Sequence, residues 1–476
     1  MTEPLILTIF GVTGDLYRTK LARSLYRLYS EGLLPEDFLI IGFARRPFTD
    51  EEFRVLTREA IENSPPRLSI NNKNNSVEEF LEHFRYVQGN LESEEDFTNL
   101  GQLLLKEDER QGICTNKLFY LATQPSLYAT ILQNIATAGL AIPCVPKSSQ
   151  DTTGWTRILV EKPFGKNIEE AERLDEMLGE LFGESQIFRI DHYLAKETVQ
   201  NILTFRFSNN VFESLWNNKA IERVHIIFHE SKTVGTRGGF YDGIGALRDV
   251  GQNHMLQMLA LLAMEPSKDM SADTIRAARA AVLEQTHLFK TDRGGGVVRG
   301  QYEGYLQESQ VGPDSQTETF FRVILGVNNE RWKGVPFELE SGKAVAEARV
   351  SLHIYFKGTT KCNCAISHSE GHQNILTFDV QPNEGIRFRF WFKRPGFHSS
   401  VEPQELSFNY ARETNMEMSH DAYERVLYDG LKGDQTLFTN TKEIMAEWRV
   451  VTEIIDTWQS VPLTLYSKGS RAEEIV

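Results

Sequence analysis

Cysteine is scarce in this sequence, and long apolar runs are absent. The four cysteines, Cys114, Cys144, Cys362 and Cys364, show no spacing typical of a zinc site, so we expect free thiols in a reducing compartment. The most apolar run, residues 255–264, is too short to span a bilayer. No basic leader precedes the first short apolar stretch, and we therefore expect no signal peptide and a cytoplasmic location.

Positive charge is also in deficit. The chain has 51 Lys and Arg against 66 Asp and Glu, which gives a net charge of −15. A protein of this sign repels polyphosphates and anionic lipid surfaces at long range. We therefore expect neither nucleic acid nor a membrane as a partner, and a small anion should bind only where basic side chains and helix N-termini gather locally.

The first apolar segment, Leu5–Phe10, is continuous, which predicts a strand buried on both faces of a parallel sheet. The turn after it reads Gly11-Val12-Thr13-Gly14-Asp15-Leu16, and a helical pattern follows. Glycines in this position let the backbone approach a pyrophosphate, and the helix offers free N–H groups and the positive end of its dipole. The turn is therefore the first candidate cofactor site.

A second apolar segment, Phe38–Phe43, predicts the next strand, and Arg45 and Arg46 follow its end. An acid at this strand end takes the ribose 2′-hydroxyl of NAD, whereas an arginine accommodates a 2′-phosphate. The sequence thus favours NADP as the cofactor, with NAD as the alternative.

Strands and helices alternate as far as residue 188. One predicted strand, Arg157–Val160, runs into Glu161-Lys162-Pro163-Phe164-Gly165, which places Lys162 at the carboxyl end of a parallel strand, where ligands bind in open α/β sheets. We expect Pro163 to fix the backbone there through a cis bond. Residues 1–188 are therefore predicted to form an α/β Rossmann-like, NADP-binding domain.

The second half has a different pattern. Strand-like segments such as Phe320–Val327 and Arg349–Phe356 follow one another without long helices, which predicts a large, mainly antiparallel sheet. One helix, expected over 245–262, is apolar almost all round and must be buried, with Asp249 and Asn253 one turn apart. The 476 residues thus divide into two predicted domains, 1–188 and an α+β substrate-binding domain, 189–476, to which the family resemblance described below adds a role in dimerisation.

The densest group of titratable residues lies at the start of this second domain. It reads Arg189-Ile190-Asp191-His192-Tyr193-Leu194-Ala195-Lys196-Glu197. We expect it to form the floor of an anion-binding active site. Oxidation of an alcohol needs a base for the hydroxyl proton, for which histidine is suited near neutral pH, and an adjacent carboxylate would hold the imidazole in the right tautomer. His192 and His254 are both candidates, and the residues alone leave open which acid pairs with which histidine.

These motifs, together with Gly238-Gly239-x-x-Asp242 and Arg248-Asp249-x-x-Gln252-Asn253-His254, resemble those of the glucose-6-phosphate 1-dehydrogenase family, in its order and spacing, from near residue 5 to about residue 456. The resemblance implies a Rossmann-like domain followed by a large antiparallel sheet, and a homodimer or homotetramer. It implies oxidation of D-glucose 6-phosphate to 6-phospho-D-glucono-1,5-lactone with NADP, the first step of the oxidative pentose phosphate pathway.

The resemblance also implies residue roles. His254 would be the general base and Asp191 its carboxylate partner, while His192, Tyr193 and Lys196 would hold the substrate phosphate.

Further roles implied by the resemblance concern the sugar and the cofactor. Lys162 would contact the sugar near the reacting hydroxyl, and Glu230 and Asp249 would take ring hydroxyls. Lys343 would reach the phosphate end, and Gln381 would line the same cup. The residues expected around the NADP phosphates are Thr13, Asp15, Lys20 and Arg45.

Several positions depart from the family pattern. Tyr17 replaces a usually small residue and could crowd the first helix, Ala195 replaces a glycine, and Ala348 replaces a basic residue. Asp379 stands where some members have a basic residue that helps to hold a second, structural NADP, so we do not predict that second site. Two other functions stay open: another NAD(P)-dependent sugar or polyol oxidoreductase, and a non-catalytic NADP-binding sensor.

Overall fold

The structure, a computed structural model, describes residues 3–63, 76–142, 144, 154–289, 296–359, 372–397, 401–413 and 420–475. The chain divides into two units. Unit 1 comprises Met1–Gly165, Glu169–Ala195 and His420–Thr441. Unit 2 comprises Lys166–Ile168, Lys196–Ser419 and Lys442–Val476. The predicted boundary at residue 188 lies close to the main crossing, but residues 420–441 return to unit 1, so the functional division into 1–188 and 189–476 stays a prediction.

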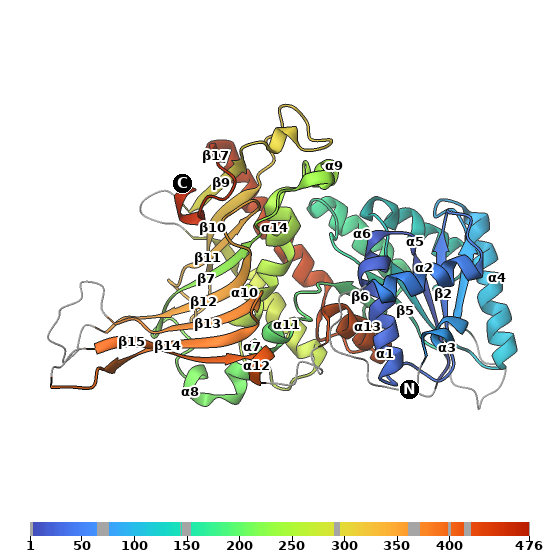
Figure 1. Ribbon diagram of the computed structural model, residues 1–476, viewed down its shortest axis with the longest axis horizontal. Coiled ribbons are helices and arrows are strands. Elements are labelled where there is room, and N and C mark those ends of the chain that lie inside the picture. The colour runs from blue at the N-terminus through green and yellow to red at the C-terminus, as the bar shows by residue number, and fades with distance from the viewer. Residues whose placement is uncertain are drawn as a thin grey trace. The chain divides into compact units, whose positions relative to one another are not determined.

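Unit 1 is built on a seven-stranded sheet of order β16-β6-β5-β4-β1-β2-β3 (Figure 1). Its strands are β1 Leu5–Phe10, β2 Phe38–Ala44, β3 Phe84–Gln88, β4 Asn116–Leu121, β5 Thr156–Val160, β6 Ile187–Ile190 and β16 Phe438–Thr439. Among the described strands, β1 to β6 pair in parallel and β16 pairs antiparallel with β6. The strand order reverses at β1 and β4, which creates the crevice where ligands bind in such sheets. The predicted Rossmann-like fold is confirmed.

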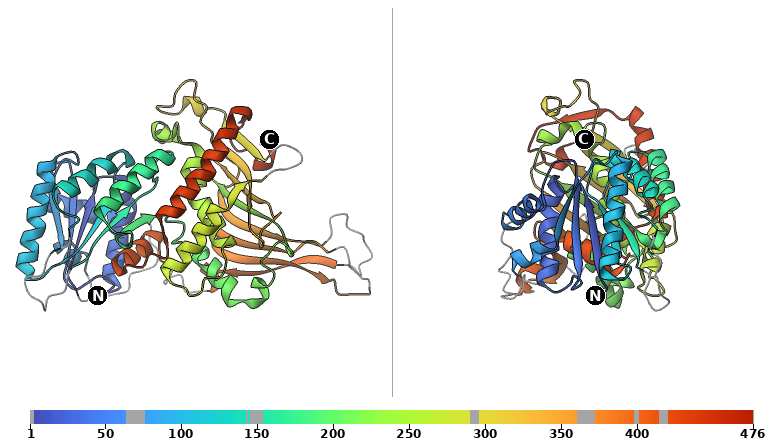
Figure 2. Two further views of the ribbon diagram at one scale, coloured as in Figure 1. Left: turned by 180° about the vertical axis from the view of Figure 1, so that it is seen from behind. Right: turned by 90° about the vertical axis from the view of Figure 1, so that its right-hand side faces the viewer.

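Helices pack on both faces of this sheet (Figure 2). They are η1 Tyr17–Leu21, α1 Ala22–Ser30, α2 Asp50–Glu62, α3 Val77–Glu82, α4 Glu94–Gln111, η2 Pro125–Leu127, α5 Tyr128–Thr137, α6 Ile168–Leu181, η3 Glu184–Gln186 and α13 Ala422–Lys432. The helix α3 begins with a capping box, in which Ser76 and Glu79 bond each other's backbone amides. The polar, turn-rich segment 64–79 predicts an exposed loop. The end of that prediction is wrong, because residues 77–79 belong to α3, while residues 64–75 lie outside the described part of the chain.

Tyr17 does not crowd the first helix. Its side chain is fully buried, and its hydroxyl bonds Thr57 Oγ1 on α2 at 2.7 Å. Its ring lies 5.6 Å from that of Phe53 on the same helix. The large side chain therefore fills the space between η1 and α2, and its polar tip has a partner, as a buried hydroxyl requires.

Unit 2 is built on a ten-stranded sheet whose main path runs β15-β14-β13-β12-β7-β11-β10-β9-β17, with β8 against β10. Its strands are β7 Ile221–His229, β8 Thr286–Leu288, β9 Val297–Tyr302, β10 Phe320–Val327, β11 Phe337–Gly342, β12 Arg349–Phe356, β13 Ile375–Gln381, β14 Gly385–Lys393, β15 Val401–Asn409 and β17 Leu463–Tyr466. Most pairs are antiparallel, as predicted, but β11 lies parallel to β7, and β17 lies parallel to β9.

The sheet of unit 2 has an apolar and a polar face. On β7, Val224, Ile226 and Phe228 are buried and face the helix layer, whereas Arg223 and His225 point to the other side. The helical elements of this unit are α7 Glu197–Ser208, α8 Asn210–Glu213, η4 Gly235–Arg237, α9 Gly238–Tyr241, η5 Leu247–Met255, α10 Leu256–Ala263, α11 Ala272–Glu284, η6 Tyr305–Gln307, α12 Tyr410–Glu413, α14 Thr441–Thr457, η8 Trp458–Ser460 and η9 Ala472–Glu474. Figure 1 shows α7, α10, α11 and α14 on one side of the strands.

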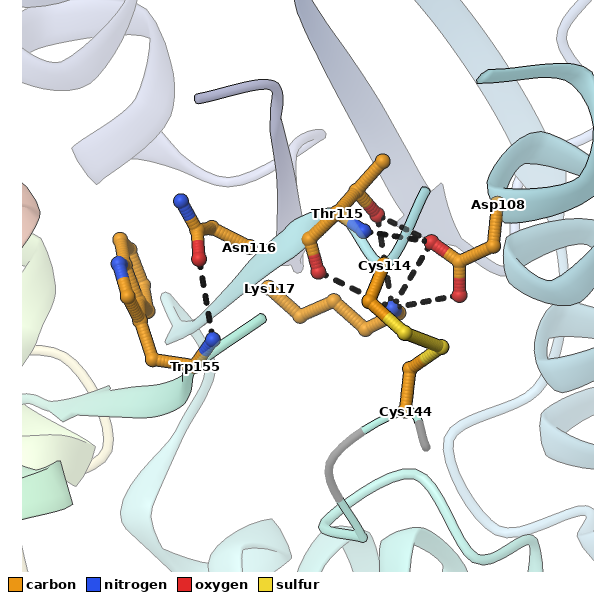
Figure 3. Close-up of a disulfide and its surroundings, with 7 residues drawn as sticks. All are labelled: Asp108, Cys114, Thr115, Asn116, Lys117, Cys144 and Trp155. Atoms are coloured by element: carbon orange, nitrogen blue, oxygen red, sulfur yellow. Dashed lines mark hydrogen bonds and ion pairs between the residues drawn. A yellow bond between two sulfur atoms is a disulfide. The ribbon is translucent and has the colours of Figure 1, made fainter. Parts of the chain in front are cut away.

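The free-thiol prediction is wrong for two of the four cysteines. Cys114 and Cys144 form a disulfide in unit 1 (Figure 3). Cys114 directly precedes β4, and Cys144 follows α5, which returns the chain to the edge where β4 begins. A β–α crossover therefore brings together two residues 30 positions apart, and spacing alone did not reveal it. Cys362 and Cys364 lie outside the described residues.

None of the helices within the described ranges is both long and apolar enough to cross a membrane.

Candidate active site

The glycine turn lies at the carboxyl end of β1. Gly11 has φ +92°, and a Cβ there would lie 2.6 Å from the carbonyl oxygen of Ala122, so only glycine fits. Its own carbonyl accepts the amide of Gly14 at 2.9 Å, which closes the turn directly before the helical residues Asp15 and Leu16. The predicted order of strand, tight turn and helix N-terminus is present, with its phosphate-binding geometry.

Two basic residues lie near this turn in unit 1. Arg45 is exposed immediately after β2, the neighbour of β1, and no acid stands at this strand end. Lys20 lies on η1, where its Nζ is 3.2 Å from Asp421 Oδ2. The site residues Thr13 and Leu16 are partly exposed, and Asp15 is exposed. This edge of the sheet therefore fits a dinucleotide with an additional phosphate.

Lys162 follows β5 at the same sheet edge, and its bond to Pro163 is cis, as predicted. The residue before it, Glu161, is fully inside the protein, and its Oε1 accepts the hydroxyl of Tyr120 at 2.7 Å. Tyr128 donates to the Glu161 carbonyl at 3.1 Å. Burial raises the pKa of Glu161 to about 7, against the opposing effects of Tyr120 and Lys162. The sequence analysis did not include Glu161 among the site residues, although its position directly before Lys162 could have indicated it.

Asp191, His192 and Tyr193 follow β6 in unit 1. Asp191 is buried, and its Oδ1 accepts the amide of Tyr193 at 2.9 Å, which fixes the orientation of the carboxylate. The His192 ring is stacked on Tyr423 at 5.6 Å between centroids. The next basic residue, Lys196, is the N-cap of α7 and belongs to unit 2. The dense run predicted as one floor therefore crosses from one unit to the other.

Three predicted substrate residues meet in unit 2. Glu230 follows β7, Lys343 follows β11, and the parallel pairing of these strands puts both residues at one end of the sheet. The Lys343 ammonium bonds the Glu230 carboxylate and lies 3.6 Å from Asp249 Oδ2. Lys343 is 12% exposed, so the ion pair with Asp249, itself 17% exposed, is partly shielded from water.

His254 lies on the same element as Asp249, the π-helix η5. It is buried, and its ring stacks on that of Phe228 on β7, with 6.1 Å between centroids. The helix is held in place because Gln252 and Gln257 both donate to Glu447 on α14, at 3.1 and 2.6 Å. π-Helical turns are rare and occur mostly at functional sites.

The predicted helix through this region is therefore present, but its wide turns were not foreseen. Its first turn is fixed by Glu318, whose Oε1 accepts the amide of Leu247 at 2.9 Å. Burial raises the pKa of Glu318 to about 7. The sequence analysis did not single out Glu318 either, because the residues around it in the sequence form no motif.

Gln381 ends β13 and is exposed, with a cis bond to Pro382. It pairs with Val350 on β12, which pairs in turn with Phe228 on β7. Gln381 thus lies at the sheet end that carries Glu230.

The paired glycines 238 and 239 contact another part of the chain. A Cβ on Gly238 would lie 2.1 Å from the Ser309 carbonyl oxygen, and one on Gly239 would lie 2.4 Å from Gln310. Asp242 accepts the amide of Gly312 and the hydroxyl of Tyr305, both at 3.0 Å. Within the described structure, the Gly238-Gly239-x-x-Asp242 motif therefore packs against the segment 305–312.

The fold and these residues define a class of protein. A doubly wound sheet with a glycine turn before a helix is a nucleotide-binding domain, and the second unit carries a buried histidine on η5, the element that also carries Asp249, an ion-pair partner of Lys343. This combination is that of a nicotinamide-dependent dehydrogenase with a separate substrate-binding unit.

Comparison with known proteins identifies the family. The family model "Glucose-6-phosphate dehydrogenase, NAD binding domain" matches residues 8–201, and "Glucose-6-phosphate dehydrogenase, C-terminal domain" matches residues 203–475. The chain belongs to the glucose-6-phosphate dehydrogenase family. The resemblance stated from the motifs is thereby confirmed.

Relatives and solved structures agree. Glucose-6-phosphate 1-dehydrogenase of Chlamydia muridarum is 37% identical, with 96% of this chain and 91% of the relative covered. That of Bacillus subtilis is 35% identical, with 95% and 91% covered. A solved structure of glucose-6-phosphate dehydrogenase in complex with its substrate glucose-6-phosphate superposes with a TM-score of 0.87 at 31% identity, covering 99% of this chain and 95% of the other.

The fold alone does not decide the chemistry. The transcriptional regulator Gal80p matches with a TM-score of 0.51 at 11% identity. Only the family membership and the site residues therefore separate an enzyme from a regulator on this scaffold.

Proposed function

We propose that the protein oxidises D-glucose 6-phosphate to 6-phospho-D-glucono-1,5-lactone with NADP as hydride acceptor, the first step of the oxidative pentose phosphate pathway. The observation that carries the proposal is the group formed by Glu230, Asp249 and Lys343, in which Asp249 lies on η5, the element that also carries the buried His254. Relatives over nearly the whole chain are named for this substrate, and one solved relative contains it.

His254 accepts the proton of the reacting hydroxyl in this proposal. A buried imidazole between an aromatic ring and a fixed helix is well oriented, and histidine is a suitable base near neutral pH. Asp191 pairs with it and stabilises the imidazolium, since its carboxylate is already oriented by the Tyr193 amide. The two residues belong to different units, so their pairing is an inference from the family motif.

The remaining side chains bind the two ends of the sugar phosphate. His192, Tyr193 and Lys196 bind the phosphate, for which a lysine and an imidazole are suited donors. Glu230 and Asp249 accept from ring hydroxyls, and Lys343 both holds these carboxylates and extends toward the phosphate end. Lys162 contacts the sugar near the reacting carbon, and Gln381 lines the cup.

The cofactor is NADP in this proposal. The residues fit it, because the turn closed by Gly11 and Gly14 comes directly before a helix N-terminus, where a pyrophosphate binds, and Arg45 stands where NAD-specific domains carry an acid. The cofactor contacts come from Gly11, Thr13, Gly14, Asp15, Leu16, Lys20, Arg45 and Lys162. Bound NADP supplies the hydride acceptor, while these residues fix its phosphates.

The decisive experiment mixes the purified protein with NADP and either glucose 6-phosphate or glucose, and follows NADPH absorbance. We expect reduction with glucose 6-phosphate. Lys196→Ala should raise KM for glucose 6-phosphate by about 10- to 100-fold, the effect of losing a charge-assisted hydrogen bond, and hardly change glucose oxidation. Lys219→Ala, at an exposed lysine of the same unit, is the matched control.

The outcomes separate the alternatives. Equal losses with both sugars would indicate another sugar or polyol oxidoreductase, and no NADPH at any pH would leave a cofactor-binding sensor.

We also infer a cytoplasmic location and a homodimer or homotetramer. A relative 38% identical, from Arabidopsis thaliana, is named as cytoplasmic. Because Cys114 and Cys144 form a disulfide, they no longer support a reducing compartment as free thiols would. The location is therefore to be measured directly. Fractionation of cells with thiol blocking at lysis tests the location, and sedimentation of the purified protein tests the assembly.

A further inference from the structure

A second group of metal-ligating side chains lies on the polar face of the unit 2 sheet. It consists of His225 on β7 and of Glu338 and Glu340 on β11, which we call the β7–β11 cluster. The two strands pair in parallel with His225 opposite Glu338, and Glu340 lies two residues further along the same face. None of the three belongs to the candidate active site.

The geometry of this cluster suits a single small cation. One ligand atom from each residue lies within 4.8 Å of the other two. Zinc bonds nitrogen and oxygen at about 2.0–2.2 Å, so its ligand atoms lie up to about 4 Å apart, and small side-chain rotations would close the difference. His225 Nε2 points into the group, 3.9 Å from Glu340 Oε1.

His225 is the least satisfied member of the cluster. Its Nε2 is buried and makes no hydrogen bond within the described structure. Its side chain is only 15% exposed, so water does not easily compensate. This buried nitrogen is a candidate ligand atom, since imidazole nitrogen is a common donor to zinc.

The surrounding residues hold the two carboxylates in place beside His225. Arg322 Nε donates to Glu340 Oε2 at 2.6 Å and lies 3.4 Å from Glu338 Oε1. Arg322 is itself anchored on the Ala472 carbonyl at 2.8 Å. The other oxygen of Glu340, Oε1, lies 3.0 Å from His229 Nε2. Such outer contacts orient ligands in metal sites.

A nearby histidine makes a useful contrast. His353 is on β12, in register with His225, and points to the same face. Both of its ring nitrogens are engaged, one with Ser351 Oγ at 2.9 Å and the other with Thr377 Oγ1 at 3.1 Å. His353 is therefore not a ligand, although it shares the location and the burial of His225.

We propose that His225, Glu338 and Glu340 bind one divalent first-row transition-metal ion, with zinc as the best fit and water completing its coordination. One imidazole with two carboxylates suits this class, whereas calcium and magnesium prefer oxygen ligands alone. Arg223, 3.7 Å from Glu338 Oε2, and Arg322 offset the two carboxylates, so the affinity is weaker than that of a structural four-ligand zinc site. The ion ties together the strands that end at Glu230 and Lys343.

The test measures zinc in the full-length protein without a purification tag. The protein is stripped with a chelator, dialysed against buffered zinc and analysed by elemental mass spectrometry. The wild type should carry one zinc ion more than His225→Ala, and His353→Ala should keep the wild-type content. Loss of a direct ligand should weaken zinc binding by at least about 100-fold, more than loss of an outer contact.

A second measurement keeps the proposal testable if the His225→Ala variant misfolds. Glu338→Gln removes a ligand charge at a partly exposed side chain and preserves its shape. With cobalt as the probe, the wild type should show a visible d–d absorption band that is lost in Glu338→Gln, while circular dichroism stays unchanged. Equal metal content in the wild type and both ligand variants would overturn the proposal, and so would an equal loss in His353→Ala.

Discussion

His254 is the residue on which the proposed chemistry most depends. Its imidazole is buried against Phe228, on a π-helix that Gln252 holds to Glu447 on α14, and Gln257 in the following α10 donates to the same carboxylate. A base in this setting has few accessible orientations, so the proton-accepting nitrogen is positioned before substrate binds.

His254→Asn should therefore lower kcat by about 10²- to 10⁴-fold, the usual contribution of a general base, with little change in KM. Steady-state kinetics measure both values. His192→Asn is the comparison, since loss of a phosphate contact should act on KM. Wild-type turnover in His254→Asn would transfer the role of base to His192.

Glu161 should make stability depend on pH. Its folded-state pKa is about 7, above the ordinary value of 4.5, because it is buried. Between these pH values the folded protein holds a proton that the unfolded chain has lost. The resulting stabilisation is complete below about pH 4.5 and is lost as the pH rises through 7, at up to about 1.4 kcal/mol per pH unit.

Glu161→Gln should abolish this share of the pH dependence, because the amide does not titrate. Urea unfolding from about pH 5 to 8 measures the slope for both proteins. Glu318→Gln is the parallel variant in unit 2, with its own raised pKa. The same slope in the wild type and Glu161→Gln would show that this carboxyl group has an ordinary pKa.

At the scale of elements, the cofactor preference that we propose rests on the residues that follow β2. Arg45 and Arg46 are both exposed there, and the Arg46 carbonyl accepts the hydroxyl of Tyr86 at 2.5 Å. Arg45→Ala should lower kcat/KM for NADP by about 10- to 100-fold and leave that for NAD nearly unchanged, because only NADP has the 2′-phosphate. The control is Arg46→Ala, which removes the same charge one residue away. An equal loss of kcat/KM for NADP in this variant would indicate general electrostatic attraction of the cofactor and not a specific contact of Arg45 with the 2′-phosphate.

The disulfide is a property of the β4–α5 element pair. It closes a loop of about 30 residues, for which chain entropy gives roughly 3–4 kcal/mol of stabilisation. Cys114→Ser should lower the free energy of unfolding by up to this amount, and dithiothreitol should have the same effect on the wild type but none on the variant. Chemical denaturation measures the difference, and indifference of the wild type to reductant would contradict the bond.

Elements with strong local patterns could be predicted from the sequence. β10 and β12 have the predicted bounds, because alternating and continuous apolar runs reflect burial directly. β11 was not foreseen, since Glu338 and Glu340 interrupt its apolar pattern and its partner β7 lies more than a hundred residues earlier. The π-helix was also missed, because side-chain types do not distinguish its hydrogen bonding from that of an α-helix.

The sequence could predict individual residues of the site, but not how these residues come together in space. Glu230, Asp249 and Lys343 were each predicted singly, and they meet through the pairing of β7 with β11 and the packing of η5, which no local pattern encodes. The disulfide escaped prediction for the same reason, because a crossover and not sequence spacing joins Cys114 to Cys144.

At the scale of the whole molecule, each unit contributes only part of the proposed set of functional groups. Unit 1 carries the glycine turn, Lys162 and Asp191, and unit 2 carries Lys196, His254 and the Lys343 group. Family models cover nearly all of both units. The proposed reaction thus requires residues from both units. For this reason no single motif identified the family, and the motifs of both units were needed together.

The most direct test of the central claim follows the hydride itself. Glucose 6-phosphate with deuterium at C1 is incubated with the protein and NADP, and the reduced cofactor is analysed by mass spectrometry. Oxidation at the anomeric carbon predicts NADPH that carries the deuterium and a lactone that has lost it. NADPH without deuterium, or with deuterium only when another carbon is labelled, would contradict the account.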